Sequence, residues 1–350
     1  MSQSQPTAGF SLATAAPVAG ALLFAVAVAG FLIVSKIGRQ HEPVSYQPAP
    51  VAAGERGGSM RLVVPGEWGP SPIYRPVVSG AGFARDLVLE RIIQVDETGD
   101  KPVFTLAVVE VDNEGKTGTI RLRRGLRFHA HPCVPGGREA DQGDLAFSIQ
   151  LAQERLGVGV SSVAVEEDRV RVSLEGPSPY AGLSRVWLVP RELAGCELAD
   201  LDDLRQLVGT GPFAFSGPVA GDEITLVRHD GYWGVGPDGQ PLPYLDEVTL
   251  GVATDLGDQL LRGEADVAYG PLSAGLADPG GALRSDLAAA GVVAVPFDKP
   301  TGEAEAPGLF VVALPHVLVP GVDPSTGRIR HPVGADLFGR LAYRMGHRPD

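Results

Sequence analysis

The chain has 350 residues, of which 44% are hydrophobic and 20% are charged, and its formal net charge at pH 7 is -13. This length and composition suit a globular protein of one or two domains and exclude wholesale disorder. The negative charge repels a phosphate backbone, and no run of Lys and Arg is long enough to offset it. Nucleic acid is therefore excluded as a partner.

The first apolar segment follows a tail at residues 1–9 and covers residues 10–34, which contain no charged side chain. A helix of about 20 mainly apolar residues spans the hydrocarbon core of a bilayer, so this segment predicts a single transmembrane anchor. A cleaved signal peptide is the alternative. Signal peptides usually have a basic start and a shorter apolar stretch, which favours an uncleaved anchor here.

Residues 35–59 are predicted to form a flexible linker, because Pro, Ala and Gly are frequent from Glu42 to Ser59 without apolar periodicity. Lys36 and Arg39 follow the anchor. By themselves these two charges favour a cytoplasmic location for the residues after the anchor.

The segments after residue 60 predict a mixed α/β fold. Two pairs of β-rich segments flank turn-forming clusters and predict hairpins. One predicted helix opens with Asp141 at the position of an N-cap, and another is predicted to end before Gly263. The expected strands are 62–64, 103–111, 119–123, 162–165, 170–174, 223–228, 247–251 and a short one from 267, and the expected helices are 83–93, 141–155 and 255–262.

Four motifs occur in an order that resembles one protein family. Lys101-Pro102 precedes Ile120-Arg-Leu-Arg-Arg-Gly-Leu-Arg-Phe-His129, which is similar to a strand ending in Leu-Arg-x-Gly-Val-x-Phe-His. Gly143-Asp-Leu-Ala-Phe-Ser148 is similar to a helix start with Glu-Asp-Val-x-x-Ser. The others are Gly209-Thr-Gly-Pro-Phe213 with Leu226-Val-Arg-His-Asp-Gly-Tyr-Trp-Gly234, and Pro243-Tyr-Leu-Asp-Glu-Val248 with Leu260-Leu-Arg-Gly-Glu-Ala-Asp-Val267. Together they resemble the oligopeptide and dipeptide-binding proteins of ABC importers, the extracytoplasmic solute-binding proteins of bacterial family 5.

The resemblance implies a periplasmic binding protein-like fold of type II. It assigns residues 60–314 to a first lobe, with an inserted subdomain at about 80–175 and a hinge strand near Phe310 to Leu314. Residues 315–350 are similar to the start of a second lobe, most of which the chain lacks. It also implies an extracytoplasmic location, against the bias of the two charges that follow the anchor.

Several residues are candidates for binding a solute, since such sites use aromatic faces and backbone groups. Gly209, Thr210 and Gly211 leave room for a ligand to approach the backbone, but a tight turn requires the same residues. Tyr232 and Trp233 either stack on a solute or pack in the core. Trp68 and Tyr74 lie where the ligand-facing loops of the family begin.

The two cysteines, Cys133 and Cys196, leave two interpretations open: a disulfide in an exported domain, or two buried thiols. Cys133 also enters a third hypothesis. His129, His131 and Cys133 alternate, and on an extended strand they would share one face and suit a zinc ion.

The apolar segment at residues 10–34 predicts membrane anchoring, and the family resemblance implies a protein that is not an enzyme, needs no cofactor and captures peptides or similar small solutes for an ABC transporter permease. No hydrolase, phosphate-loop or dinucleotide motif is present in the sequence. The alternative is a one-lobed relative that acts as a surface scaffold or sensor without a role in transport.

Overall fold

The computed structural model describes residues 55–66, 80–95, 102–112, 114–176, 178–196, 203, 206–216, 223–236, 238–296, 309–315, 317–318 and 341–343. The chain divides into two compact units, Met1–Val44 and Ser45–Asp350, and all of these residues lie in the second. Among them, no helix is long and apolar enough to cross a membrane. The anchor predicted at residues 10–34 lies outside the described residues, as do Trp68 and Tyr74.

The described residues form a mixed seven-stranded sheet, in which the central strand β1 pairs in parallel with β10 and β11 and the remaining pairs are antiparallel. In spatial order the strands are β12 (Val293–Pro296), β13 (Leu309–Ala313), β11 (Val267–Pro271), β1 (Ser59–Pro65), β10 (Glu247–Ala253), β9 (Glu223–Arg228) and β8 (Phe213–Phe215). The mixed α/β class and the strands expected at 62–64, 223–228, 247–251 and from 267 are confirmed.

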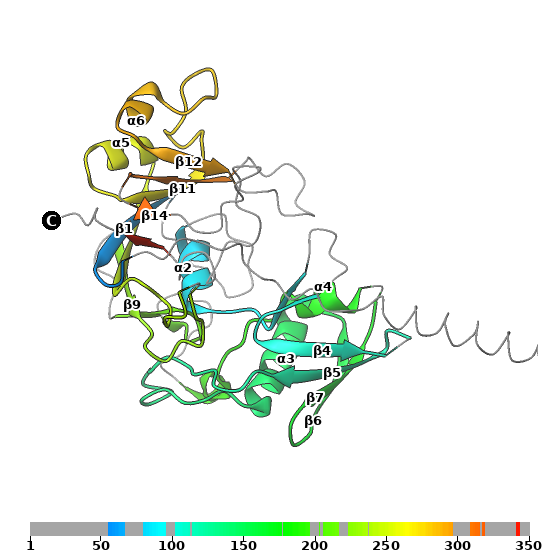
Figure 1. The fold of residues 1–350 in the computed structure, drawn as a ribbon. Helices are drawn as coiled ribbons and strands as arrows, with labels where there is room; N and C mark the ends of the chain where they lie inside the picture. The colour runs from blue at the N-terminus through cyan, green and yellow to red at the C-terminus, as the bar shows by residue number, and fades with distance from the viewer. Residues whose placement is uncertain are drawn as a thin grey trace, which may run out of the picture. The chain divides into compact units, whose positions relative to one another are not determined.

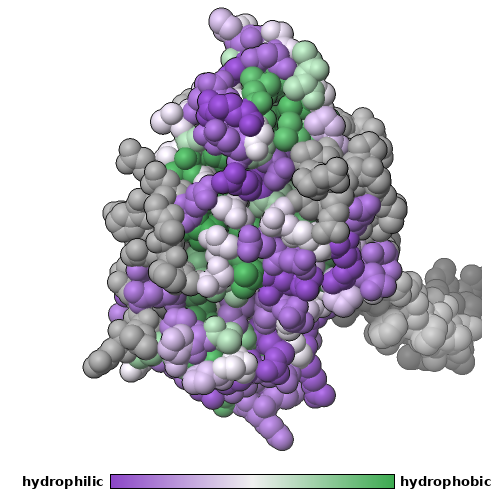
Figure 2. All heavy atoms as spheres, turned by 90° about the vertical axis from the view of Figure 1, so that its left-hand side faces the viewer, coloured by the Kyte–Doolittle hydropathy of each residue, from purple (hydrophilic) through white to green (hydrophobic). Residues whose placement is uncertain are grey.

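Strand β1 holds two hydrophobic cores together. Leu62 and Val64 pack in the larger core and Val63 packs in the smaller one, because successive side chains of a strand point to opposite faces. The smaller core also contains Leu256 and Leu260 of α5 (Leu256–Leu261), the helix expected at 255–262 with Asp255 as its N-cap, and Leu287 of α6 (Ser285–Ala289). The face shown in Figure 2 is mainly hydrophilic, with apolar side chains gathered at the height of α5, α6 and β12.

A separate four-stranded sheet contains the two predicted hairpins, β4 (Ala107–Val111) with β5 (Thr117–Leu122) and β6 (Val160–Val165) with β7 (Val170–Leu174). Its strand order is β4-β5-β7-β6 (Figure 1). Asp112 closes the first turn by accepting a hydrogen bond from the Lys116 amide at 2.8 Å, and this bond lowers the pKa of its carboxyl. Both hairpins therefore form at the predicted turns, but the strand predicted at 103–111 is broken at Thr105 and Leu106, and only its second part, β4, belongs to this sheet.

Helix α3 (Gln142–Leu156) lies against this sheet. Asp141 is its N-cap, and the Asp144 side chain accepts from the Asp141 amide in return, which completes a capping box. The helix expected at 141–155 is confirmed, and Gly157, with φ 61°, ends it in the left-handed conformation.

Helix α2 (Gly80–Val88) is shorter than the predicted helix 83–93. In its last turn Arg85, Leu87 and Val88 are buried. The chain then runs extended, with the Ile92 amide donating to the Val186 carbonyl and the Leu188 amide donating to the Glu90 carbonyl. The prediction assigned Ile92 to the helix because its spacing from Val88 fits a helix. Hydrogen bonding with the segment at Val186 to Leu188 ends the helix before Ile92 instead.

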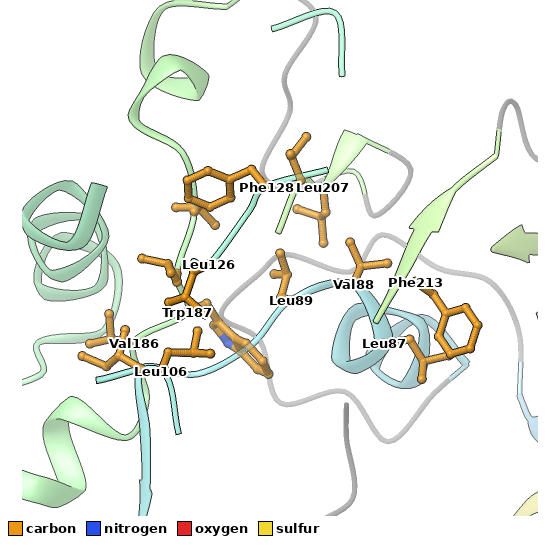
Figure 3. Packing of buried hydrophobic residues seen from close by; sticks show 14 of the residues in the cluster. Leu87, Val88, Leu89, Leu106, Leu126, Phe128, Val186, Trp187, Leu207 and Phe213 are labelled. Atoms are coloured by element: carbon orange, nitrogen blue, oxygen red, sulfur yellow. The ribbon is translucent and has the colours of Figure 1, made fainter. Parts of the chain in front are cut away.

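The larger core connects the two sheets. It joins Leu87, Val88 and Leu89 to Phe213 of β8 and to Leu106, Leu126 and Phe128, which flank the strands of the four-stranded sheet (Figure 3). The remaining elements are short: β2 (Ile93–Val95), β3 (Pro102–Phe104), α4 (Pro179–Leu183), η2 (Arg191–Gly195), β14 (Val317–Leu318) and β15 (Ala342–Tyr343).

Candidate functional site

The Gly209-Thr210-Gly211 loop packs directly against the end of α2. The Gly211 amide donates to the Val88 carbonyl at 3.0 Å. A Cβ at Gly209 would collide with the Val88 carbonyl oxygen, and one at Gly211 would collide with the carbonyl oxygens of Leu87 and Val88. Glycine is thus required at both positions because the loop backbone approaches the backbone of α2 too closely for a side chain. This supports a structural role for the motif over a ligand-binding role.

Two histidines hold the same loop from the other side. His129 Nε2 and His229 Nδ1 donate to the Gly211 carbonyl at 2.9 and 3.1 Å, which assigns each ring the tautomer protonated at that nitrogen. The rings meet edge to face, with centroids 4.6 Å apart. Burial and the neighbouring His229 lower the pKa of His129 to about 3, and burial also lowers the pKa of His229.

We expect this pair to make the fold sensitive to acid. Because the pKa of His129 is about 3 in the folded state and about 6.5 in the unfolded chain, only the unfolded state binds this proton between those values. The free energy of unfolding should be independent of this group above about pH 6.5 and fall below it, by about 2 kcal/mol between pH 7 and pH 5.

Urea unfolding at several pH values measures this loss. In His129→Gln the side-chain amide can still donate to the Gly211 carbonyl. Below about pH 6.5, the slope of the free energy of unfolding against pH should be smaller in this variant by the equivalent of about one bound proton. The matched change His131→Gln, at a less buried ring, should reduce the slope less. An unchanged slope in His129→Gln would show that His129 titrates alike in both states.

A buried carboxylate connects three of the predicted site residues. Glu90 is 7% exposed, and its two carboxylate oxygens accept from the Thr210 hydroxyl at 2.8 Å, from the Tyr232 hydroxyl at 3.2 Å, and from the Trp233 indole N–H at 3.0 and 3.2 Å. Three segments that are far apart in the sequence therefore meet at one side chain. We call Glu90, Thr210, Tyr232 and Trp233 the Glu90 network.

The sequence analysis missed Glu90, although a signal for it exists. It stands between Leu87-Val88-Leu89 and Ile92-Ile93, all of which are buried. A lone acid inside such an apolar segment must find several hydrogen-bond donors in the folded protein, since an unpaired buried charge is very costly.

The members of the Glu90 network differ in exposure. Thr210 is fully buried and Tyr232 is 9% exposed, so both serve the packing of this region. Trp233 is only partly buried, and the guanidinium of Arg123 lies over its ring, 4.3 Å from the centroid. Of the predicted binding residues within the described parts of the chain, Trp233 keeps an accessible aromatic surface.

The cysteines form a disulfide. Cys133 and Cys196 are bonded, with their Cα atoms 5.9 Å apart, which decides between the two interpretations that the sequence left open. Close by, Arg138 donates to the fully buried carboxylate of Asp144 at 2.6 and 2.7 Å and to Glu192 at 2.7 Å. The hydrogen bond from Arg138 lowers the pKa of Glu192, and these ion pairs fix η2 beside the start of α3.

The zinc hypothesis for His129, His131 and Cys133 is corrected by these bonds. The Cys133 sulfur is bonded to Cys196, the His131 Nδ1 accepts from the Cys133 amide at 3.1 Å, and His129 faces Gly211. The segment turns at Val134 instead of continuing as an extended strand, so the expected common face does not form. Within the described residues, no three His, Cys, Asp or Glu side chains are grouped as metal ligands.

The middle of the chain matches a known family. Residues 140–283, which include α3, the disulfide partner Cys196 and both Gly209-Thr-Gly211 and Tyr232-Trp233, match the profile described as "Bacterial extracellular solute-binding proteins, family 5 Middle". The match covers 144 of the 350 residues, which is less than half of the chain. The resemblance deduced from the order of the motifs is confirmed by this match.

The chain is also similar to curated proteins and to solved structures. The chain is 45% identical over 240 residues to the peptide transport periplasmic protein SapA of Salmonella typhimurium, an alignment that covers 58% of this chain and 42% of SapA. Its fold is similar to the periplasmic binding protein DppA of Helicobacter pylori in complex with the peptide STSA (TM-score 0.53, 20% identity, 69% of this chain and 51% of DppA). It is also similar to MoaA of A. tumefaciens R10 in complex with mannopinic acid (TM-score 0.54, 18% identity, 71% and 50%).

These alignments are partial. The matched parts cover less than half of the length of each of the curated relatives found. The two structural comparisons, at 20% identity or less, establish the periplasmic binding protein-like fold alone.

Proposed function

We propose that the chain is an extracytoplasmic solute-binding protein, not an enzyme, that captures peptides or similar small solutes for the permease of an ABC importer. The observation that carries this proposal is the family 5 match of residues 140–283. The relation to SapA, whose name describes peptide transport, supports a peptide-class ligand. Such a function requires a concave surface with aromatic and backbone contacts, and no nucleophile, metal or cofactor.

The location outside the cytoplasm has a second line of support. The Cys133–Cys196 disulfide joins segments 63 residues apart, and disulfides persist mainly in oxidising compartments. We propose that residues 10–34 tether the protein to the membrane and that residues 35–59 space the binding module from the bilayer.

The residues of the site divide into two roles in this proposal. Four of the candidates have a structural role and fix the conformation of the loop: Gly209, Thr210, Gly211 and Tyr232. They form hydrogen bonds within the protein or are buried in its interior. Trp233 offers an aromatic surface to the solute. Trp68 and Tyr74, which stand between β1 and α2 in the sequence, are proposed as further aromatic contacts.

Thermal unfolding of the chain, with and without a mixed library of short peptides, tests this function. A ligand at about 100 times its dissociation constant stabilises the folded state by about 2.7 kcal/mol, which raises the melting temperature of a domain of this size by roughly 5 to 10 °C. Trp68→Ala and Tyr74→Ala should each reduce the rise. Phe104→Leu, a change of a partly buried residue on β3, is the matched control and should keep it.

A cooperative transition that no peptide moves would contradict the proposal. Such a result would favour the alternative of a scaffold or sensor without a role in transport. Membrane attachment is tested separately: the full chain should pellet with membranes after a carbonate wash, whereas a chain that starts at residue 35 should remain in the supernatant.

A further inference from the structure

Three arginines project from the turn that follows β5. Arg123, Arg124 and Arg127 are all exposed, and we call them the arginine turn. Hydrogen bonds fix its backbone on both sides, from the Arg123 amide to the Leu106 carbonyl at 2.8 Å and from the Ala140 amide to the Leu126 carbonyl at 2.8 Å. The guanidinium groups thus extend from a rigid base.

The arginine turn differs from the other arginines of the same sheet in having no acidic partner. Arg121 forms ion pairs with Glu110 and Asp168, and Arg171 forms one with Glu166. Among the described residues, no carboxylate lies within ion-pair distance of Arg123, Arg124 or Arg127. Arg123 instead covers Trp233, and Arg127 reaches the Gly137 carbonyl at 3.5 Å.

One carboxylate is near the turn without neutralising it. Glu139 Oε1 accepts from the Gly125 amide at 2.7 Å, in a turn where Gly125 has φ 78°. The carboxylate is therefore held by the backbone at the base of the turn. Three positive charges therefore lie within five residues and are opposed at close range by this one carboxylate, in a chain whose net charge is -13.

We propose that the arginine turn is a docking surface for an acidic segment of a partner protein. A guanidinium presents a planar set of donors that matches a carboxylate, often with two parallel hydrogen bonds. Charges farther apart than about 8 Å are screened at physiological ionic strength, so a compact acidic segment contacts the turn while the distant acids of this chain repel it little. An anionic bilayer is an extended surface that meets the net charge of the chain as well, which disfavours it as the occupant.

Fluorescence anisotropy with labelled poly-L-glutamate tests the docking surface on the full chain. Because Arg123 lies over Trp233, the rise in melting temperature with the short-peptide library is measured on the same variants, and an unchanged rise separates docking at the turn from peptide capture. We expect binding that weakens as salt is added. In R123Q/R124Q/R127Q the affinity should fall roughly tenfold, because exposed ion pairs contribute about a factor of two to three each.

Two variants make the result specific. R61Q/R171Q/R262Q removes the same charge from three exposed arginines that already have acidic partners, and it should bind within twofold of the wild type. R123K/R124K/R127K keeps the charge but loses the paired guanidinium donors, and its affinity should lie between those of the wild type and R123Q/R124Q/R127Q. If the triple glutamine variant fails to fold, R124Q alone is used, since the described part of the chain shows no side-chain contact for Arg124, and it should bind about twofold more weakly.

The proposal is overturned if R123Q/R124Q/R127Q, or R124Q where the triple variant does not fold, binds polyglutamate as tightly as the wild type does. It is also overturned if the control triple weakens binding equally, because net charge alone would then explain the affinity. Binding of the wild type, but not of R123Q/R124Q/R127Q, to vesicles that contain phosphatidylserine, without binding to polyglutamate, would assign the turn to a membrane instead of a protein.

Discussion

Replacing Glu90 by Ala should lower the free energy of unfolding by about 3 to 5 kcal/mol, which is a large part of the stability of an ordinary domain. The change leaves the Thr210 hydroxyl and the Trp233 indole N–H without their acceptor, in a region where Thr210 is fully buried. It also leaves a cavity beside Leu89. Urea unfolding followed by tryptophan fluorescence measures the loss.

The isosteric change Glu90→Gln separates hydrogen bonding from volume. Its amide nitrogen would face a donor where an oxygen now accepts, so we expect a loss of roughly 2 kcal/mol without a cavity. Glu110→Gln, on an exposed position of β4, is the matched control and should change stability by less than about 0.5 kcal/mol. Equal effects of Glu90→Gln and Glu110→Gln would show that the buried network does not stabilise the fold.

The Glu90 network explains why the Gly209-Thr210-Gly211 and Tyr232-Trp233 motifs, predicted from the sequence to bind a ligand, also stabilise the fold. Glu90 follows α2, Thr210 precedes β8, and Trp233 follows β9, so their meeting fixes the larger core to the two segments that carry the family motifs. A solute that contacts the accessible part of Trp233 would touch a ring already held through its indole N–H. Positioning of this kind reduces the entropy that is lost when a ligand binds.

Local features of the fold were predictable because their causes are local. The Asp112 turn selects a hairpin, and Asp141 with Asp144 caps α3 through bonds within four residues. The end of α2 was not predictable in the same way. Ile92 has helical spacing from Val88, but backbone hydrogen bonds with Val186 and Leu188 hold Glu90 to Ile92 extended, and no pattern within the segment indicates that partner.

The same distinction applies to the candidate site. The Gly209-Thr210-Gly211 and Tyr232-Trp233 motifs were found from their order along the chain. Their roles depend on contacts with Val88, His129 and Glu90, each of which is at least 80 residues away in the sequence. The alternating His129, His131 and Cys133 suggested a metal because the sequence does not show that the chain turns at Val134. Long-range contacts, and not residue types, decided these assignments.

Removing the Cys133–Cys196 disulfide should cost about 4 kcal/mol, the second large effect that we expect. The cross-link closes a loop of 63 residues, and the loss of loop-closure entropy in the unfolded chain sets the magnitude, with measured values for native disulfides of about 2 to 5 kcal/mol. The folded state should persist in C133S/C196S, because the Arg138 ion pairs with Asp144 and Glu192 hold the same region. Urea unfolding measures the difference.

Reductant provides the internal control. Reduced wild type should match C133S/C196S in its free energy of unfolding, whereas the double variant should not respond to reductant at all. Since the bond acts on the unfolded chain, the m-value should rise when it is removed, as the chain then exposes more surface on unfolding. If reduction frees two titratable thiols but leaves the midpoint of the wild type unmoved, the disulfide does not stabilise this fold, and its support for an oxidising location is lost with it.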